Sequence, residues 1–145
     1  MVRAPHLVGL LSAGLLAACT YPPPPPAPGL STCTVNRVVD GDTVNISCSG
    51  RAAENARIIG YDTPETFEPR CTGEAAAGAA ATAYLRHMLD AATTITVVPS
   101  GDRDRYGRPL IRLETDGQDV AGWMVTAGHA ERYSGGRRPD WCAAG

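Results

Sequence analysis

The sequence has no lysine. All 13 of its basic side chains are arginines, and 15 acidic residues bring the formal net charge to −2. A negative net charge argues against a protein that binds polyanions by bulk electrostatic attraction. A local arginine site can still bind phosphate, because the guanidinium fork matches the geometry of phosphate oxygens. The charge balance therefore disfavours a generic polyanion binder and leaves a localised phosphate site open.

The sequence also has no apolar run of the ~20 residues that a transmembrane helix requires. The apolar stretch from Leu7 to Ala18 follows a single cation, Arg3, and is typical of a secretory signal peptide over residues 1–18. Its end, LAAC, resembles the lipobox of bacterial lipoproteins, which implies cleavage before Cys19 and acylation of that cysteine. An ordinary signal peptide cleaved nearby and an uncleaved anchor are the alternatives.

The lipobox interpretation places the protein in the cell envelope, attached to a membrane by its acylated N-terminus. Thr20 after the cysteine resembles the sorting signal for the outer membrane, with the protein facing the periplasm or the cell surface. Residues 20–30 include five consecutive prolines, which force an extended polyproline stalk. Residues 31–145 are the length of one domain and contain no internal repeat. We expect this domain to be a monomer.

Cysteine spacings typical of zinc sites are absent, because no CxxC or Cys/His pattern occurs. Four cysteines remain after the lipobox, and an even number in an exported domain indicates disulfides, for which three pairings are possible. If Asp40-Gly41 is a two-residue hairpin turn, Cys33 faces Cys48 across the two strands. This geometry predicts the pairs Cys33–Cys48 and Cys71–Cys142.

The secondary-structure pattern predicts a mainly β domain with helices, of the α+β class. Two strands surround Asp40-Gly41-Asp42, and an alanine-rich segment over residues 74–90 predicts a helix. The expected strands are 34–39, 43–48, 56–61, 94–98 and 110–114, with a short helix over 119–127 and an extended piece over 129–133. Five short strands with one inserted helix favour a small closed barrel over a doubly wound sheet.

Three segments carry the candidate chemistry: VVDGDTV (38–44), RIIGYDTPE (57–65) and DRYGRPL (104–110). The first two place Asp42, Asp62 and Glu65 at strand ends, which a small barrel can bring within a few ångströms. Carboxylates so near to one another repel unless a hard cation neutralises them. An oxygen-only ligand set, to which Thr63 could add its carbonyl oxygen, favours Ca²⁺ or Mg²⁺ over zinc.

Two arginines complete this set. Strand alternation places Arg57 on the same face as Ile59 and Tyr61, and a cation on an apolar face needs a carboxylate or phosphate partner. Arg108 lies in a glycine-containing loop from which it can reach inward. A divalent cation, two arginines and a spare carboxylate are the groups that a phosphodiesterase needs.

In this order, DGDT, DTPE and DRYGR resemble the staphylococcal nuclease (thermonuclease) family over about residues 33–133. The resemblance implies an OB-type five-stranded β-barrel with about three helices. It also implies Ca²⁺-dependent hydrolysis of DNA and RNA by in-line attack of water, leaving 3′-phosphates. The roles that it implies are metal ligation by Asp42, Asp62 and the Thr63 carbonyl, a general base in Glu65, phosphate binding by Arg57 and Arg108, and further substrate contacts by Arg105, Tyr106 and Tyr133.

The sequence departs from the family prototype in two ways. Its four domain cysteines are absent from the prototype and resemble exported proteobacterial members, and the long basic surface of the prototype is missing. We expect Arg137 and Arg138 to lie in a solvated tail, with contact to a phosphate as the alternative. The alternative function is a non-catalytic OB-type module that binds nucleic acid or an envelope partner, and a purely structural lipoprotein is a third possibility.

Overall fold

The computed structural model describes residues 32–143. The expected signal peptide, the acylated Cys19 and the linker over residues 20–30 lie outside these residues and stay predictions. Within 32–143, no helix has both the length and the apolar character needed to cross a membrane. Residues Ser31–Gly145 form a unit of their own, to which all of the following elements belong.

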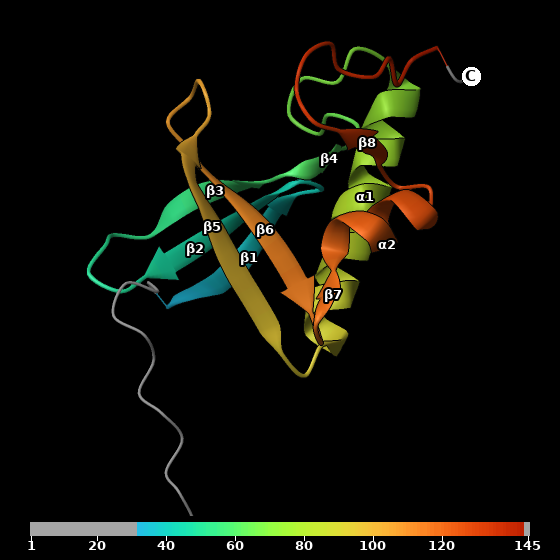
Figure 1. Cartoon of the computed structure of the whole chain (residues 1–145). Coiled ribbons are helices and arrows are strands. Elements are labelled where there is room, and N and C mark those ends of the chain that lie inside the picture. Colours follow the sequence, from blue (N-terminus) through green and yellow to red (C-terminus); the bar gives the residue numbers. More distant parts are fainter. Residues whose placement is uncertain (1–31, 144–145) are drawn as a thin grey trace, which may run out of the picture. The chain divides into compact units, whose positions relative to one another are not determined.

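A curled antiparallel and parallel sheet forms one side of this unit, and both helices lie on the other (Figure 1). Five strands follow one another across the sheet in the order β1 (Cys33–Asp40), β2 (Thr43–Cys48), β3 (Glu54–Ile58), β6 (Pro109–Thr115) and β5 (Ile95–Arg103). The short β7 (Gln118–Asp119) pairs with β6. The mixed order arises because β3 pairs with β6 in parallel, whereas the other neighbours are antiparallel.

The predicted α+β class is confirmed, and the curled five-strand sheet is consistent with the predicted OB-type barrel, although the described residues do not close it. Strands β1 and β5 pack against each other, yet no hydrogen-bonded ladder joins them within residues 32–143, so the sheet is a half-barrel. Strand β5 runs past Pro99, where its pairing with β6 shifts, and continues to Arg103. Proline lacks the N–H group that a continuous ladder requires, which accounts for the shift.

The β1–β2 hairpin pairs Cys33 with Cys48, as predicted, although its turn differs from the prediction. Asp40 pairs with Thr43, so the turn residues are Gly41-Asp42 and not Asp40-Gly41. Two register shifts along β1 compensate for this difference before the strand reaches Cys33. Each shift is a bulge in which one strand carries an extra residue.

The predicted third strand is broken. It divides into β3, which ends at Ile58, and β4 (Gly60–Asp62), which pairs with β8 (Glu131–Tyr133) in a separate two-stranded sheet. Gly60, the first residue of β4, has a φ of 100°, a conformation that disfavours residues with a side chain. The period-two alternation therefore does not extend from Arg57 to Tyr61, and the expected shared face of Arg57, Ile59 and Tyr61 is wrong.

Two helices, not about three, occur among the described residues: α1 (Thr72–Ala91) and α2 (Val120–Thr126). The side chain of Asp119 caps α2 by accepting from the backbone N–H of Ala121. Leu85 of α1 and Met124 of α2 are fully buried, together with Ile58, Ile111 and Leu113 of the sheet. This shared apolar core holds the sheet and helices in a fixed relation.

Both predicted disulfides are present. Cys33–Cys48, the hairpin disulfide, joins the ends of β1 and β2 that lie away from their turn. Cys71–Cys142, the tail disulfide, joins the residue before α1 to the C-terminal segment, 71 positions later. The four cysteines therefore contribute structural cross-links, as expected for a protein that folds in an oxidising compartment.

Candidate active site

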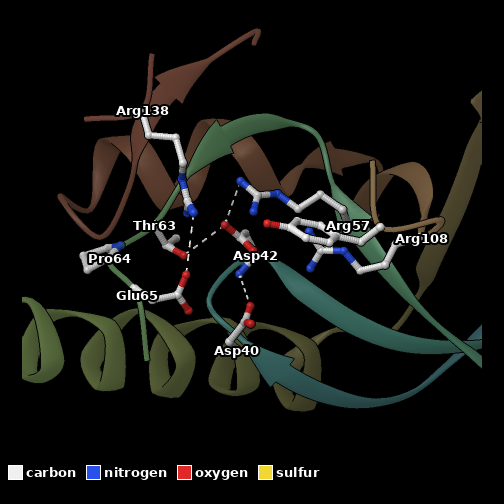
Figure 2. A pocket seen from close by; sticks show the side chains of 9 residues that line it. Asp40, Asp42, Arg57, Thr63, Pro64, Glu65, Arg108 and Arg138 are labelled. Carbon is white, nitrogen blue, oxygen red and sulfur yellow. Dashed lines mark hydrogen bonds and ion pairs between the residues drawn. The ribbon is translucent and has the colours of Figure 1, made fainter. Parts of the chain in front are cut away.

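The three motif segments meet at one cavity of about 280 Å³. The β1–β2 turn, the loop after β4 and the β5–β6 loop each contribute side chains to it, and Figure 2 shows these side chains converging. The lining residues are Asp40, Asp42, Arg57, Thr63, Pro64, Glu65, Tyr106, Arg108 and Arg138. We call this the central cavity. It gathers six of the nine substrate, metal and catalytic residues that the sequence predicted.

Asp42 is positioned by a tight turn that only glycine allows. A Cβ atom on Gly41 would lie 2.8 Å from Thr63 Oγ1 and 2.9 Å from the Cβ of Ala81 in α1. The hydroxyl of Tyr61, which is fully buried, donates a hydrogen bond of 3.0 Å to the Gly41 carbonyl oxygen. Gly41 is thus required because the turn packs closely against the side chain of Thr63 and against α1.

The Asp42 carboxylate is buried, with 4% of the residue exposed. It accepts hydrogen bonds from the hydroxyls of Thr43 (3.1 Å) and Thr63 (3.3 Å), and Arg57 Nη2 lies 2.9 Å from its Oδ2. Burial, with a further contribution from the charges of Asp40 and Asp62, raises the pKa of Asp42 to about 7 against the opposing effect of Arg57. The nearby arginine therefore does not fully compensate the buried negative charge.

Asp62 lies behind the cavity wall and does not line the cavity. Asp62 is fully buried, and its Oδ1 lies 2.8 Å from Arg57 Nη2. Arg57 thus bridges Asp42 and Asp62, and no ion pair between Arg57 and Glu65 is found in the part of the chain that the structure describes. The cation at the end of β3 is paired with both aspartates, as a partly buried guanidinium requires.

Glu65 is the accessible carboxylate of the cavity, with 38% of its side chain exposed. Its Oε1 accepts from the backbone N–H groups of Thr66 (3.2 Å) and Phe67 (3.4 Å). Its Oε2 lies 3.6 Å from Arg138 Nη1. One oxygen is thus held by the loop backbone, while the other faces the cavity beside an arginine (Figure 2).

Arg108 reaches the cavity because Asp104 folds the β5–β6 loop around it. Asp104 accepts from Arg108 Nε at 2.7 Å and from the Arg108 backbone N–H at 2.9 Å. Burial opposes ionisation of Asp104, but these bonds and the charge of Arg108 lower its pKa overall. Arg108 Nη1 also donates to Thr43 Oγ1 (3.2 Å), which links this loop to Asp42 through the Thr43 hydroxyl.

The remaining predicted contacts lie in an adjoining groove of about 810 Å³. Arg105 and Tyr133 line it, and it shares Arg57, Tyr106, Arg108 and Arg138 with the central cavity. Tyr106 is 69% exposed, and Arg105 lies over its ring with 4.7 Å between Cζ and the ring centroid. A solvent-accessible aromatic face between arginines offers a stacking surface beside the cavity.

Three residues of the site were not predicted. Asp40 lines the cavity and accepts from the Asp42 backbone N–H at 3.0 Å. Arg138 Nη2 lies 2.8 Å from Asp62 Oδ1, so the prediction of a solvated tail is wrong for this arginine. Trp141 Nε1 donates a hydrogen bond of 3.4 Å to Asp62 Oδ2. The sequence held one signal for this, because the predicted Cys71–Cys142 bridge brings the tail to the loop that follows Glu65.

The cavity residues fit a hard divalent cation in their chemistry. Asp40 and Asp42 present carboxylate oxygens next to Thr63 and Glu65, and the raised pKa of Asp42 reflects a buried charge that another cation would stabilise. Among the described residues, the one tight cluster of metal-ligand types is Cys71, Glu74 and Cys142. Its two cysteines form the tail disulfide, so that cluster is not a metal site.

The site therefore combines three functions within one small cavity. It has a partly exposed carboxylate able to accept a proton, arginines able to bind a phosphate, and acidic side chains able to hold a hard cation. These are the requirements of hydrolytic attack on a phosphodiester. A groove with arginines and tyrosines extends from it.

Comparisons with known proteins point in the same direction. A family model described as "Staphylococcal nuclease homologue" matches residues 55–140. The chain is 34% identical to Endonuclease YhcR of Bacillus subtilis (strain 168) over 128 residues, and this alignment covers 84% of this chain and 10% of that protein. It is 35% identical over 79 residues to a Thermonuclease of Staphylococcus hyicus, covering 54% of this chain and 46% of the relative. The chain thus spans less than half the length of these two relatives.

Proposed function

Because this chain belongs to the staphylococcal nuclease family, we propose that it is a nuclease that hydrolyses phosphodiester bonds of DNA, RNA or both, leaving 3′-phosphates. The observation that carries the proposal is the convergence on one cavity of Arg57 from β3, Glu65 from the loop after β4 and Arg108 from the β5–β6 loop. A phosphate in a cavity of this composition would meet guanidinium groups and a carboxylate at the same time. The curled five-strand sheet is consistent with the OB-type fold of the family.

In the proposed mechanism, Arg57 and Arg108 bind the scissile phosphate and stabilise the charge that develops on its oxygens. Glu65 accepts a proton from the attacking water, which approaches in line with the leaving oxygen. The backbone N–H groups of Thr66 and Phe67 hold one oxygen of Glu65, which fixes the direction of the other. Arg108 is the residue that we assign to the leaving side.

We propose Ca²⁺ as the cofactor, held by Asp42, Asp62 and the Thr63 carbonyl, with Asp40 as a neighbouring carboxylate. When bound, the ion would polarise the phosphate and offset the repulsion between these carboxylates. Asp62 accepts hydrogen bonds from two arginines and an indole, so metal binding by this residue requires that at least one of these hydrogen bonds break.

Substrate contacts beyond the scissile phosphate are assigned to Arg105, Tyr106 and Tyr133 in the adjoining groove. Base stacking on an exposed tyrosine needs an unpaired base, and such stacking contributes about 1–3 kcal/mol per base. The formal net charge of −2 gives little bulk attraction for long duplexes. These features favour single-stranded or locally unpaired substrates.

The proposed setting is outside the cytoplasm, where both disulfides are stable. We propose that the chain is exported and anchored by acylation at Cys19, through the proline-rich stalk over residues 20–30, as a monomer. Mass spectrometry of the mature N-terminal peptide tests the anchor directly. An unmodified N-terminus on the mature protein would rule out the lipid attachment.

The test of function is incubation of the full chain with single- and double-stranded DNA and RNA, in Ca²⁺ or in chelator. We expect Ca²⁺-dependent cleavage, and we expect Glu65→Gln and Arg108→Ala each to lose orders of magnitude in rate while remaining folded. Glu68→Gln is the matched control, because Glu68 is an exposed carboxylate on the same loop. Binding without cleavage by the wild type would instead support the non-catalytic module, and full activity of a folded Glu65→Gln variant would refute the mechanism.

A further inference from the structure

The C-terminal strap, residues 137–142, carries an arginine into the central cavity. Arg138 Nε and Nη2 each lie 2.8 Å from Asp62 Oδ1, and Nη1 lies 3.6 Å from Glu65 Oε2. Burial disfavours the charged form of Arg138, but Asp62, Asp42 and Glu65 raise its pKa overall. Figure 2 shows this side chain entering the cavity from the side opposite Asp40. One guanidinium thus contacts two carboxylates that the proposed function uses.

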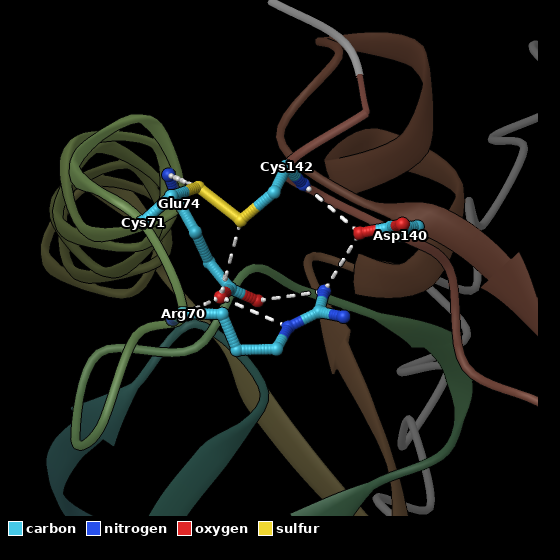
Figure 3. The surroundings of a disulfide bond; sticks show 5 residues. All are labelled: Arg70, Cys71, Glu74, Asp140 and Cys142. Atoms are coloured by element: carbon cyan, nitrogen blue, oxygen red, sulfur yellow. Dashed lines mark hydrogen bonds and ion pairs between the residues drawn. A yellow bond between two sulfur atoms is a disulfide. The ribbon is translucent and has the colours of Figure 1, made fainter.

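Several contacts hold the strap in this place (Figure 3). The tail disulfide joins Cys142 to Cys71, directly before α1. Asp140 accepts from the Cys142 backbone N–H at 3.2 Å and lies 3.1 Å from Arg70 Nη2. The ion pair with Arg70 is exposed and contributes little, so the covalent bond is the main anchor.

The loop that bears Glu65 is tied to the same anchor. The backbone N–H of Arg70 also donates a hydrogen bond of 2.7 Å to Oε2 of Glu74, a buried residue in the first turn of α1. Glu74 Oε2 lies 3.9 Å from the Cys142 sulfur, so the strap and the loop between Glu65 and α1 meet at one point. A displacement of the strap would therefore also shift the loop that positions Glu65.

The charges explain what Arg138 does for the cavity. Asp62 is fully buried, and a buried carboxylate is costly unless cations and hydrogen bonds compensate it. Arg57 supplies one cation and must also serve Asp42, so Arg138 supplies the second. Within the described residues, Arg138 is also the one side chain that forms an ion pair or hydrogen bond with Glu65 Oε2.

We propose that Arg138 is a positioning residue of the active site, and that the tail disulfide holds it there. It balances the charge of Asp62 and restrains the free oxygen of Glu65 toward the cavity. Although Arg138 lines both the central cavity and the adjoining groove, all three of its guanidinium nitrogens face Asp62 or Glu65, so it acts through these carboxylates and not as a phosphate ligand. This inference rests on the proposed nuclease function for its effect on rate, whereas the anchoring of the strap can be measured without any activity.

An arginine is required by this geometry. Its planar fork places Nε and Nη2 on Asp62 while Nη1 faces Glu65, whereas a lysine ammonium is a single point charge that cannot reach both in the same way. A lysine would keep the charge near Asp62 and lose the restraint on Glu65. The two parts of the role are therefore separable by substitution.

The first experiment compares Arg138→Ala, Arg138→Lys and Arg137→Ala in the full chain. Arg137 is the neighbouring exposed arginine and serves as the matched control. We expect Arg138→Ala to lower kcat by about 10- to 100-fold, the range found when outer residues that orient catalytic groups are removed, with KM little changed. Arg138→Lys should recover part of kcat, and Arg137→Ala should match the wild type.

The second experiment removes the anchor. The chain has two tryptophans, so in a Trp123→Phe background the emission of Trp141 reports whether the strap is docked beside Asp62. Replacing both cysteines of the tail disulfide by serine should shift this emission to the red, increase its quenching by acrylamide and lower kcat as far as Arg138→Ala does. Replacing both cysteines of the hairpin disulfide should change neither the emission nor kcat.

Binding of a fluorescent single-stranded oligonucleotide in chelator separates positioning from substrate contact. Arg138→Ala should bind it as the wild type does, because Arg138 acts on the carboxylates. A loss confined to KM and to this affinity, or a wild-type kcat in Arg138→Ala, would overturn the proposal. Unchanged Trp141 emission without the tail disulfide would overturn the anchoring. A wild type that cleaves nothing would refute the proposed function and with it the rate effect, while the emission result would still decide the anchoring.

Discussion

Substituting Asp42 by asparagine in the metal-free protein should change how stability depends on pH. In the folded state burial raises the pKa of Asp42 from 3.8 to about 7, against the opposing effect of Arg57. The folded protein therefore keeps this proton over a pH range in which the unfolded chain has already lost it. Stability conferred by the neutral carboxyl is complete below about pH 4 and is lost as the pH rises toward 7. Asparagine cannot titrate, so the variant lacks this loss.

The magnitude follows from the two pKa values. Each pKa unit corresponds to about 1.36 kcal/mol, so the change from 3.8 to about 7 amounts to about 4 kcal/mol of unfolding free energy. Asparagine also removes the pairing with Arg57, but Arg57 keeps Asp62 as a partner at 2.8 Å. We therefore expect the variant to gain about 4 kcal/mol relative to the wild type between pH 4 and pH 7.5.

Urea unfolding in chelator, followed by circular dichroism at several pH values, measures this difference. Asp102→Asn is the matched control, because Asp102 is an exposed aspartate on β5 and its substitution makes the same change of charge. A difference between Asp42→Asn and wild type that stays constant from pH 4 to 7.5 would refute the reasoning. Saturating Ca²⁺ at pH 7.5 should stabilise the wild type and have a much smaller effect on the variant.

Two further predictions concern packing and cross-links. A methyl group on Gly78 of α1 would lie 2.9 Å from the Pro64 carbonyl oxygen. Gly78→Ala should therefore displace the loop before Glu65 and lower both the stability and the activity. Gly73→Ala is the control and should be tolerated, because a methyl group there would have no atom within 4 Å. Thermal unfolding and the nuclease assay test this pair, and a stabilised, fully active Gly78→Ala variant would contradict it. The hairpin disulfide closes a separation of 15 residues and the tail disulfide one of 71, so their removal should cost about 3 and about 4 kcal/mol in guanidinium unfolding. The reverse order would show that chain entropy does not dominate.

Several features were predictable because they depend on neighbouring residues in the chain. The alanine-rich pattern indicated α1, whose observed bounds are Thr72–Ala91, and the Asp40-Gly41-Asp42 sequence between two strands indicated the first hairpin. The turn itself was placed one residue early, and the two register shifts in β1 restored the Cys33–Cys48 pairing. The disulfide was thus correct although the turn was not, since a bulge leaves no clear mark in a sequence.

The break between β3 and β4 shows where local patterns fail. Arg57 to Asp62 looks like one continuous strand, and the single glycine within it gives little warning. The positive φ of Gly60 and the pairing of β4 with β8 place Asp62 in a buried position behind the cavity. Whether such a strand continues or turns depends on which partner strand offers hydrogen bonds, and that partner lies far away in the chain.

The sequence by itself determined the chemical types at the site: an acidic turn, a cation before a second acidic turn, and an arginine loop, in the order typical of one nuclease family. Composition and motif order carry that information, because each segment is short and contiguous. The tertiary structure alone decided that Arg57 bridges Asp42 and Asp62, that burial raises the pKa of Asp42, and that Arg138 reaches the cavity. These are properties of burial and of contacts between distant segments, and they exist only once the sheet, the helices and the tail disulfide have brought those segments together.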